Sequence, residues 1–431
     1  MQPSRDSSRD PGGPKSDVVA TAERSKSDVI ATVETPKFVP VPGVPPRCGH
    51  LFVLGAGVVG AEVLAQATSL PPIERGPALD LKVVGVARRR GGAYDVRGFD
   101  RAAVAHIVSE RRATAGSDEV APSTNAIDFP ARSTQLEALA RLSDPVLVDC
   151  TAADGMEAVY EEALLRGIHV VTANKKALVA RRDLTDRIFA AAAKTGRSFR
   201  YEATVGAGLP VIGTLQGLVR TGDRVKSIEC ALSGTLGYIA NELSKGVPLS
   251  VAVATAKSLG YTEPDPREDL AGTDVARKAV ILARELGIPL ELEHVTLTPF
   301  VPQEALDAPD LEAALVGYDA TFAARMAELR TRGERLVYLA RISVEGTRAA
   351  YRCEVKVGPV AVPQDHPAAT LDGPTALVAF TTERYGSSPL VVRGAGAGGA
   401  VTASAVLSDV FLTLSGAPVS SRGARGVAAS S

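Results

Sequence analysis

Residues 51–60 read Leu51-Phe-Val-Leu-Gly55-Ala-Gly-Val-Val-Gly60 and decide the fold of the first part of the chain. The apolar start predicts a short buried strand, and an Ala-rich helical pattern runs from Val59 to about Ala67. In a dinucleotide-binding turn the first glycine permits the tight turn, the second lets the backbone approach the pyrophosphate, and the third allows close helix–strand packing. An ordinary glycine-rich turn is the alternative, but the strand–turn–helix setting favours a dinucleotide site.

The second apolar run, Leu81–Val86, indicates which nicotinamide cofactor such a turn would bind. It does not end in the Asp or Glu that accepts a hydrogen bond from the ribose 2′-hydroxyl of NAD. It continues into Ala87-Arg88-Arg89-Arg90, and an arginine at this place can pair with the 2′-phosphate of NADP. The sequence therefore favours NADP. NAD, with the arginines as a solvated basic loop, stays the alternative.

Strands and helices alternate through the first half of the chain. Val146–Asp149 and His169–Thr172 are further apolar runs, separated by a helical pattern from Gly155 to Arg166. This order predicts an α/β fold with a Rossmann-type, doubly wound parallel sheet. The polar stretch 90–135, rich in Gly and Arg, receives no assignment.

The pattern changes after about Tyr201. Strands of an open sheet are expected where apolar and polar residues alternate, in Arg224–Leu232 and Arg341–Val357. Amphipathic helices are expected at Val251–Leu259, Asp274–Leu286 and Asp319–Arg330, the last with Asp319 as its N-cap. We therefore expect a second, α+β domain for catalysis and association. A glycine-rich stretch, Gly394–Gly399, then precedes a helical pattern, Val401–Leu412, which we expect to pack on the first domain.

These patterns divide the chain into four parts. Residues 1–47 are polar, contain the repeat Lys15–Thr21 echoed by Lys26–Thr32, and cannot bury enough apolar surface to order themselves. We expect the following order: a disordered tail at 1–47, a cofactor-binding domain at 48–200 completed by 390–412, a catalytic and dimerisation domain at 201–389, and a flexible tail at 413–431.

Composition excludes several classes of protein. The net charge is −1, which gives no reason to expect nucleic acid or an acidic membrane as a partner. No apolar run approaches the roughly 18 residues of a membrane span, and the N-terminus lacks the layout of a secretory signal. The four cysteines stand far apart, with no metal-binding or disulfide spacing. A cytoplasmic location is therefore expected.

The stretch Gly260–Lys278 holds the densest group of charged residues. Asp274 and Lys278 are four residues apart, so they lie on one helix face, where a plain surface ion pair is the alternative to a functional role. Carbonyl reduction needs a proton donor beside the oxygen, and a lysine can serve. A substrate with an α-ammonium group needs carboxylates, which Glu263 and Asp269 can supply.

Five motifs match a known family. They are the turn at 55–60, Asp149-Cys-Thr151, Val171-Thr-Ala-Asn-Lys175, Tyr201-Glu-Ala-Thr-Val-Gly-Ala-Gly208 and the stretch 260–278. With them the chain resembles the homoserine dehydrogenases, in the short form that has neither an aspartate-kinase domain nor a C-terminal regulatory domain. The similarity runs from about Leu51 to about Leu412. It implies NAD(P)H-dependent hydride transfer between L-aspartate-4-semialdehyde and L-homoserine, in threonine, methionine and isoleucine biosynthesis.

The resemblance also implies roles for individual residues. The catalytic residues would be Lys278 as proton donor, Lys175 between nicotinamide and substrate, and Asp274 orienting the reacting hydroxyl. Substrate-binding residues would be Glu263, Asp269, Asp274, Tyr261, Gly234 and Thr235. Cofactor-binding residues would be Gly55, Ala56, Gly57, Val58, Val59, Gly60, Arg88, Thr151, Lys175, Gly260 and Gly398. Taken singly, Lys175 could equally be a charge that flanks a helix.

The resemblance implies a sodium ion and a homodimer as well. Glu202 and the backbone of Val205, Ala207 and Leu209 would hold the ion, since a hard cation prefers oxygen ligands. Glu202 as a structural hydrogen-bond acceptor is the alternative. The dimer would form through the sheet of the second domain. Too few residues follow Leu412 for a regulatory domain, so threonine feedback through one is not expected.

Two rival functions remain. An acylating semialdehyde dehydrogenase would use Cys150 as its nucleophile, whereas a small packed side chain at the end of a strand is the simpler interpretation. A regulator that senses NADP(H) without chemistry would bind cofactor and show no turnover. This hypothesis gives the charged stretch 260–278 no function.

Overall fold

The computed structural model describes residues 47–69, 79–88, 91–114, 132–347, 350–372 and 375–416. The expected tails lie almost wholly outside this part of the chain, and so do Arg89 and Arg90. Two sheets of six strands organise the described residues.

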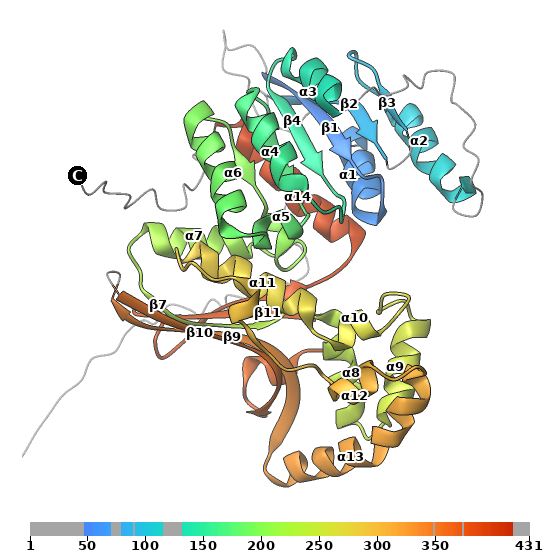
Figure 1. Cartoon of the computed structure of the whole chain (residues 1–431), viewed down its shortest axis with the longest axis vertical. Helices are drawn as coiled ribbons and strands as arrows, with labels where there is room; N and C mark the ends of the chain where they lie inside the picture. The colour runs from blue at the N-terminus through green and yellow to red at the C-terminus, as the bar shows by residue number, and fades with distance from the viewer. Residues whose placement is uncertain are drawn as a thin grey trace, which may run out of the picture. The chain divides into compact units, whose positions relative to one another are not determined.

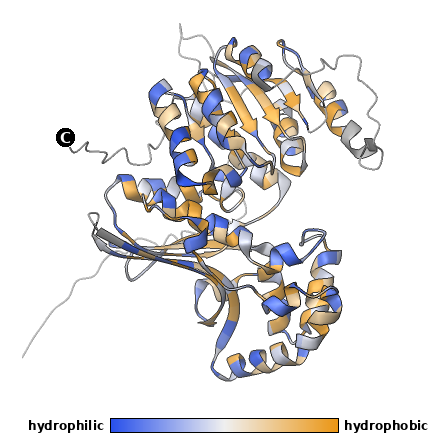
Figure 2. Ribbon diagram, in the orientation of Figure 1, coloured by the Kyte–Doolittle hydropathy of each residue, from blue (hydrophilic) through white to orange (hydrophobic). Residues whose placement is uncertain are grey.

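The first sheet has the strand order β3-β2-β1-β4-β5-β6. Its strands are β1 (Arg47–Leu54), β2 (Leu79–Ala87), β3 (Gly92–Tyr94), β4 (Pro145–Asp149), β5 (His169–Thr172) and β6 (Phe199–Arg200). All neighbours pair in parallel except β3, which runs antiparallel to β2 at one edge. All residues of β4 and β5 are buried, and Figure 2 shows the central strands as mainly hydrophobic. This confirms the doubly wound sheet.

Helices cover both faces of this sheet (Figure 1). They are α1 (Val58–Ser69), α2 (Arg101–Thr114), α3 (Arg132–Ala140), α4 (Met156–Leu165), α5 (Lys176–Val179), α6 (Arg182–Thr195) and α14 (Gly399–Leu414). The stretch without a sequence assignment thus contains β3, α2 and the start of α3. The last helix packs against α1, as predicted, and a Cβ at Gly399 would lie 2.8 Å from Val58 Cγ1.

The second sheet has the order β12-β11-β7-β9-β10-β8, and its pairs are antiparallel except β10 with β8. Its strands are β7 (Val225–Ala231), β8 (Thr296–Leu297), β9 (Glu334–Thr347), β10 (Ala350–Pro363), β11 (Thr375–Thr382) and β12 (Leu390–Ala395). The helices of this region are η1 (Glu202–Thr204), α7 (Val211–Arg220), α8 (Gly234–Ser244), α9 (Leu249–Ser258), α10 (Arg267–Leu270), α11 (Thr273–Glu285), η2 (Leu292–His294), α12 (Gln303–Leu306), α13 (Leu311–Thr331) and η3 (Pro367–Thr370).

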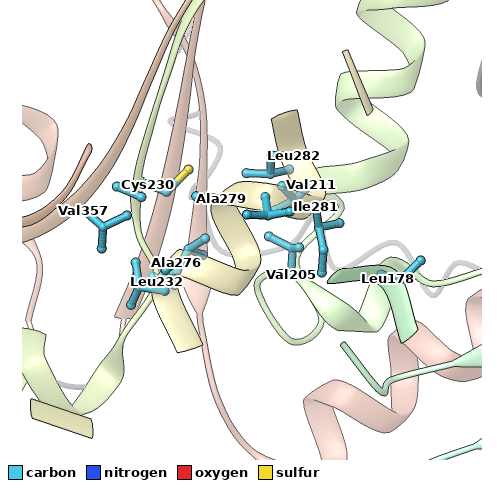
Figure 3. Close-up of a cluster of buried hydrophobic side chains, with 14 of the residues drawn as sticks. Leu178, Val205, Val211, Cys230, Leu232, Ala276, Ala279, Ile281, Leu282 and Val357 are labelled. Atoms are coloured by element: carbon cyan, nitrogen blue, oxygen red, sulfur yellow. The ribbon is translucent and has the colours of Figure 1, made fainter. Parts of the chain in front are cut away.

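Helix α11 lies at the centre of the main core. Every residue from Lys278 to Glu285 in this helix is buried. Figure 3 shows Cys230, Leu232 and Val357 on one side of the helix and Leu178, Val205 and Val211 on the other. A helix that is buried on all sides belongs to the interior of a protein. Helix α11 therefore contacts both domains, and the residues at its start lie where the two domains meet.

One detail of the sequence-based assignment was wrong. Asp319 does not begin a helix; it lies inside α13, which begins after its N-cap Asp310. The Asp319 carboxylate instead accepts hydrogen bonds from the Ser250 amide (2.8 Å) and hydroxyl (2.7 Å) in the first turn of α9. The strands expected within 341–357 belong to β9 and β10, which pair as an antiparallel hairpin.

The returning segment also differs in detail from the expected boundaries. Residues 390–395 form β12 in the second sheet, and only the segment from Gly399 onward packs on the first sheet's helices. Leu414 is fully buried at the end of α14, inside the region expected to be a tail. Among the described helices, none combines the length and apolar character that a membrane crossing requires.

Candidate active site

A cleft of about 890 Å³ lies where the carboxyl ends of β4 and β5 meet the starts of α8 and α11. Ligands of open α/β sheets bind at this edge of the strands. The predicted site residues that line the cleft are Thr151, Lys175, Gly234, Thr235, Glu263, Asp269, Asp274 and Lys278. The structure therefore brings the two predicted lysines and the predicted carboxylates together from both domains.

Two lysines share the Asp274 carboxylate at the centre of the cleft. Lys278 Nζ lies 2.9 Å from Asp274 Oδ2, and Lys175 Nζ lies 3.3 Å from Oδ1. Lys278 Nζ also donates to the Leu232 carbonyl oxygen at 2.7 Å, and only 9% of the residue is exposed. Lys278 thus makes contacts beyond those of a plain surface ion pair, because it is buried and also binds a backbone carbonyl.

The Asp274 carboxyl is held in its charged form. Burial alone would raise its pKa, but the positive charges of Lys278 and Lys175 outweigh that effect and hold the pKa well below its usual range. The side chain is still 49% exposed, because it faces the open cleft. A substrate oxygen entering here would meet two ammonium groups oriented by one carboxylate.

A second group of carboxylates, Asp269 and Glu263, lines the same cleft. Asp269 Oδ1 accepts a hydrogen bond from the Thr235 hydroxyl (3.1 Å), and Oδ2 accepts one from the Glu263 amide (2.8 Å). Burial raises the pKa of Asp269. These bonds hold the loop that carries the Glu263 side chain, and both carboxylates line the cleft.

The start of helix α8 faces the same cleft. The Ser233 hydroxyl caps this helix by accepting from the Leu236 amide at 3.1 Å. Within the described part of the chain, the amides of Gly234 and Thr235 have no acceptor. Unpaired amides at the beginning of a helix attract anionic groups such as a carboxylate.

The glycine turn adopts the conformation that its sequence predicts. Gly55 has a left-handed φ of 84°, and a Cβ at Gly60 would lie 1.8 Å from the Gly55 carbonyl oxygen, so only glycine fits there. A Cβ at Gly57 would meet no atom within 4 Å, which leaves its backbone open to an approaching ligand. Ala56, Val58 and Val59 complete the turn into α1.

The turn adjoins the cleft through two neighbours. A Cβ at Gly55 would lie 2.8 Å from Thr151 Cγ2, and Thr151 lines the cleft. Gly396 and Ala397 also line it, just before α14. Gly398, the residue that the sequence singled out, is the N-cap of α14 and lies beside these two in the chain. A bound dinucleotide could therefore run from the turn into the cleft.

Asn174 is a site residue that the sequence reasoning did not assign. It lines the cleft at the end of β5, with 3% of its surface exposed. Its amide nitrogen Nδ2 donates to the Ala153 carbonyl oxygen (2.9 Å), and its Oδ1 accepts from the Lys176 amide (3.0 Å). Asn174 thus shapes the turn that carries Lys175. Its place directly after an apolar parallel strand was a signal that could have found it.

Beneath Asn174 lies a fully buried carboxylate. Asp149 accepts hydrogen bonds from the Thr151 amide (2.8 Å) and the Tyr160 hydroxyl, while burial raises the pKa of Asp149. The Tyr160 hydroxyl also contacts Thr172 Oγ1 at 2.9 Å, which accepts from the Asn174 amide at 2.9 Å. This chain of bonds fixes the ends of β4 and β5.

Two predicted site residues lie beside the cleft rather than on its lining. Gly260 has φ 71° and ends α9, with its amide donating to the Lys257 carbonyl oxygen. The Tyr261 ring packs against Tyr238, with 5.2 Å between ring centroids, and its carbonyl oxygen accepts from the Thr235 hydroxyl.

Arg88 stands immediately after β2, where the Ala87 carbonyl oxygen accepts a hydrogen bond from the Gly55 amide at 2.8 Å. The Arg88 guanidinium donates to the Ile107 carbonyl oxygen of α2. The residue is therefore close to the glycine turn, at the place where the sequence predicted it.

Glu202 lies in the loop between the two sheets. Its carboxylate accepts hydrogen bonds from the Ile212 and Gly213 amides, both at 2.7 Å, at the start of α7. Burial, together with the nearby Asp409 carboxylate, raises the pKa of Glu202 to about 7. Ala207 adopts a left-handed φ of 56°, which is uncommon for a residue other than glycine. Among the described residues, no group of three or more His, Cys, Asp or Glu is placed to hold a metal.

Cys150 does not have the environment of a nucleophile. Burial raises the pKa of its thiol well above the usual range, and the charge of Asp149 adds to that shift. A reactive cysteine needs the opposite, a stabilised thiolate. The cleft holds two lysines and several carboxylates next to a dinucleotide-type turn, an arrangement typical of nicotinamide-dependent oxidoreductases that act on small polar substrates.

Comparisons with known proteins identify the family. Residues 55–202 match the model "Homoserine dehydrogenase, NAD binding domain", and residues 210–411 match the model "Homoserine dehydrogenase". A homoserine dehydrogenase of Schizosaccharomyces pombe is 34% identical over 378 residues, which cover 85% of this chain and 95% of that protein. The chain belongs to the homoserine dehydrogenase family.

Longer relatives and solved structures agree with this assignment. A chloroplastic bifunctional aspartokinase/homoserine dehydrogenase of Daucus carota is 37% identical over 85% of this chain, which spans only 38% of that protein's length. The structure of a Candida auris protein has a TM-score of 0.73 at 32% identity, covering 86% of this chain and 99% of that one. A hyperthermophilic archaeal homoserine dehydrogenase in complex with NADPH shares the fold, with a TM-score of 0.64 at 23% identity and coverage of 86% and 99%.

Proposed function

We propose that this chain interconverts L-aspartate-4-semialdehyde and L-homoserine with NADP(H). The observation that carries the proposal is the Lys175–Asp274–Lys278 cluster, which shares one cleft with Glu263 and Asp269. A carbonyl group to be reduced needs a proton donor, and an amino acid needs groups for its two charged ends. The cleft offers a lysine as the proton donor, carboxylates for the ammonium end and backbone amides for the carboxylate end.

We propose one orientation for the substrate in the cleft. The carboxylates of Glu263 and Asp269 receive the α-ammonium group by charge. The amides of Gly234 and Thr235 at the start of α8 receive the α-carboxylate. The side chain of the substrate then points towards Lys278 and Lys175, where the aldehyde oxygen is bound.

The lysines stabilise negative charge on that oxygen and supply its proton. A bound nicotinamide supplies the hydride in reduction and accepts it in oxidation. Negative charge that develops on the substrate oxygen is stabilised by both ammonium groups. Lys278 transfers a proton from Nζ to this oxygen, giving the hydroxyl of homoserine, and Asp274 keeps Lys278 oriented. In the reverse direction Lys278 takes the proton back.

A direct assay tests this function. Pure protein is mixed with L-homoserine and NADP, and the absorbance of the reduced cofactor is followed. Reduction that depends on homoserine supports the proposal. The absence of turnover in this direction, and also with the semialdehyde and NADPH, would leave a cofactor-binding protein without this chemistry.

We also propose that NADP is the preferred cofactor, because Arg88 lies next to the glycine turn. The same assay run with NAD decides this point, since a preference for NAD would contradict a 2′-phosphate site.

The cytoplasmic location remains a prediction from the sequence.

We propose a sodium site at the Glu202 loop. Glu202 would supply a carboxylate oxygen, and Val205, Ala207 and Leu209 would supply backbone carbonyl oxygens, all suited to a hard cation. The nearby Asp409 carboxylate is 5% exposed, and burial raises its pKa to about 6. The Arg200 guanidinium acts on both carboxylates, and a bound sodium ion would add a second positive charge beside them.

The sodium site predicts a selective effect on thermal stability. At equal ionic strength and about pH 8, we expect the Tm to be a few degrees higher in NaCl than in N-methylglucamine chloride, because a ligand that binds only the folded state stabilises it. Glu202→Gln should abolish this difference. Glu229→Gln, a change on the second sheet away from the loop, should keep it. Equal Tm values in both salts would contradict the site.

We further propose a homodimer through the second sheet. Val337, Leu339 and Val362 form an apolar cluster on β9 and β10 that is separate from the main core, and η3 covers it within one chain through Ala368 and Ala369. A second copy of the chain would therefore bind the part of the second sheet that η3 does not cover. A mass of one chain, 44.7 kDa, in light scattering would contradict the dimer.

A further inference from the structure

Arg284 is a buried charge that the proposed chemistry does not use. It lies near the end of α11, with 4% of its surface exposed. Its guanidinium donates to the Leu290 carbonyl oxygen through Nε (2.8 Å) and to Glu291 Oε2 through Nη2 (2.7 Å). Burying a cation is costly, so an arginine in this place indicates a specific purpose for its hydrogen bonds.

The other branch of the guanidinium reaches into the first domain. Nη1 donates to the Leu178 carbonyl oxygen (2.7 Å) and to the Ala180 carbonyl oxygen (2.9 Å). These carbonyls end the short helix α5, whose N-cap is Lys175. The last carbonyls of a helix lack partners within it, and the guanidinium supplies hydrogen bonds to two of them.

The two domains are thus joined at both ends of α11. Near its beginning, Asp274 meets Lys175 in the cleft at 3.3 Å. Near its end, ten residues or about 15 Å further along the helix axis, Arg284 holds the far end of α5. Between these points the helix is buried, and Leu178 lies on its first-domain side (Figure 3).

We propose that Arg284 is a positioning residue for Lys175. It holds α5 against α11, so that the Lys175 ammonium stays at the Asp274 carboxylate before any substrate binds. This inference rests on the proposed function, because Lys175 matters only if the cleft carries out the reaction. It assigns to Arg284 an effect on turnover through another residue, without contact to substrate or cofactor.

Two physical reasons support this role. A helix of four residues has too few internal hydrogen bonds to hold its own position, so its placement depends on contacts made by its ends. Arginine can donate to several acceptors at once in a fixed fork, whereas a lysine ammonium is a compact point charge. A displacement of about 1 Å at a catalytic group can cost on the order of 100-fold in rate.

The test is a double-mutant cycle with Lys175. We expect Arg284→Lys to lower kcat for homoserine oxidation by about 10- to 100-fold in the otherwise wild-type enzyme. In a Lys175→Met background the same change should lower the residual kcat by less than about twofold, because the residue that Arg284 positions is already gone. A purely structural role predicts the same factor in both backgrounds, and that result would overturn the proposal.

A matched control comes from the same end of α11. The Tyr201 hydroxyl donates to Glu285 Oε1 at 2.5 Å, which links the segment after β6 to this helix. Tyr201→Phe should lower the Tm while changing kcat by less than about twofold. If Tyr201→Phe reduces kcat as much as Arg284→Lys does, any weakening of the contacts of α11 suffices, and the specific role of Arg284 is lost.

A second variant covers the case in which Arg284→Lys does not fold. The Thr185 hydroxyl contacts the Ala177 (3.2 Å) and Ala180 (3.4 Å) carbonyl oxygens of the same helix end. Thr185→Val should lower kcat, and this loss should also vanish in the Lys175→Met background. The wild-type enzyme in the same assay separates the two hypotheses. If it shows no turnover, the proposed function is wrong and this inference fails with it. If it turns over, but the substitution lowers kcat by the same factor in both backgrounds, only the role of Arg284 is wrong.

Discussion

We expect Lys278→Ala to lower kcat for homoserine oxidation by about 10²- to 10⁴-fold, the usual contribution of a positioned acid or base. The change removes the ammonium that lies 2.9 Å from Asp274 and 2.7 Å from the Leu232 carbonyl oxygen. The substrate oxygen then loses its proton donor and part of its charge stabilisation. Steady-state kinetics in both directions measure this effect, which corresponds to about 3–5 kcal/mol of transition-state stabilisation.

The control for this experiment is another lysine of the same cleft. Lys176 lines the cleft, but its ammonium pairs with Asp154 at 2.9 Å. Lys176→Ala should leave kcat within about twofold of the wild type. The affinity of Lys278→Ala for NADPH, measured by fluorescence, should also stay unchanged, because the glycine turn lies elsewhere. Near-normal turnover in Lys278→Ala would show that another group delivers the proton.

The second large effect concerns the glycine turn, where two glycines should respond differently. Gly57→Ala should leave the Tm close to that of the wild type, since the added methyl group meets no atom within 4 Å. The dissociation constant for NADPH should nevertheless rise at least about tenfold, because the methyl group occupies the space that the pyrophosphate approaches. Isothermal titration calorimetry and thermal unfolding measure the two quantities on the same sample.

Gly60→Ala should impair both the stability of the fold and the binding of the cofactor. Its Cβ would lie 1.8 Å from the Gly55 carbonyl oxygen, so the turn and α1 have to move apart. Both the Tm and the affinity for NADPH should fall. Gly217→Ala, in helix α7 with no atom within 4 Å, is the neutral control. If Gly57→Ala binds NADPH as tightly as the wild type, the cofactor does not lie against this turn.

Local patterns in the sequence determined the parts of this protein that depend on neighbours in the chain. The glycine turn follows from steric limits on the backbone, and the helix of Asp274 and Lys278 follows from its apolar periodicity. The same holds for the parallel strands β4 and β5, which are apolar throughout because helices cover both faces of their sheet. These features needed no knowledge of distant contacts.

Contacts between distant segments were decided only by the tertiary structure. Lys175 meets Asp274 because α5 packs against α11, and nothing in either segment specifies that partner. Asp319 looked like an N-cap, but it lies inside a longer helix and binds the start of α9. Arg284 reads as an ordinary charge at a helix end, yet it is buried between two domains. Periodicity in the sequence predicts which face of a helix is buried. Only the packing of whole helices and strands decides which residues that face contacts.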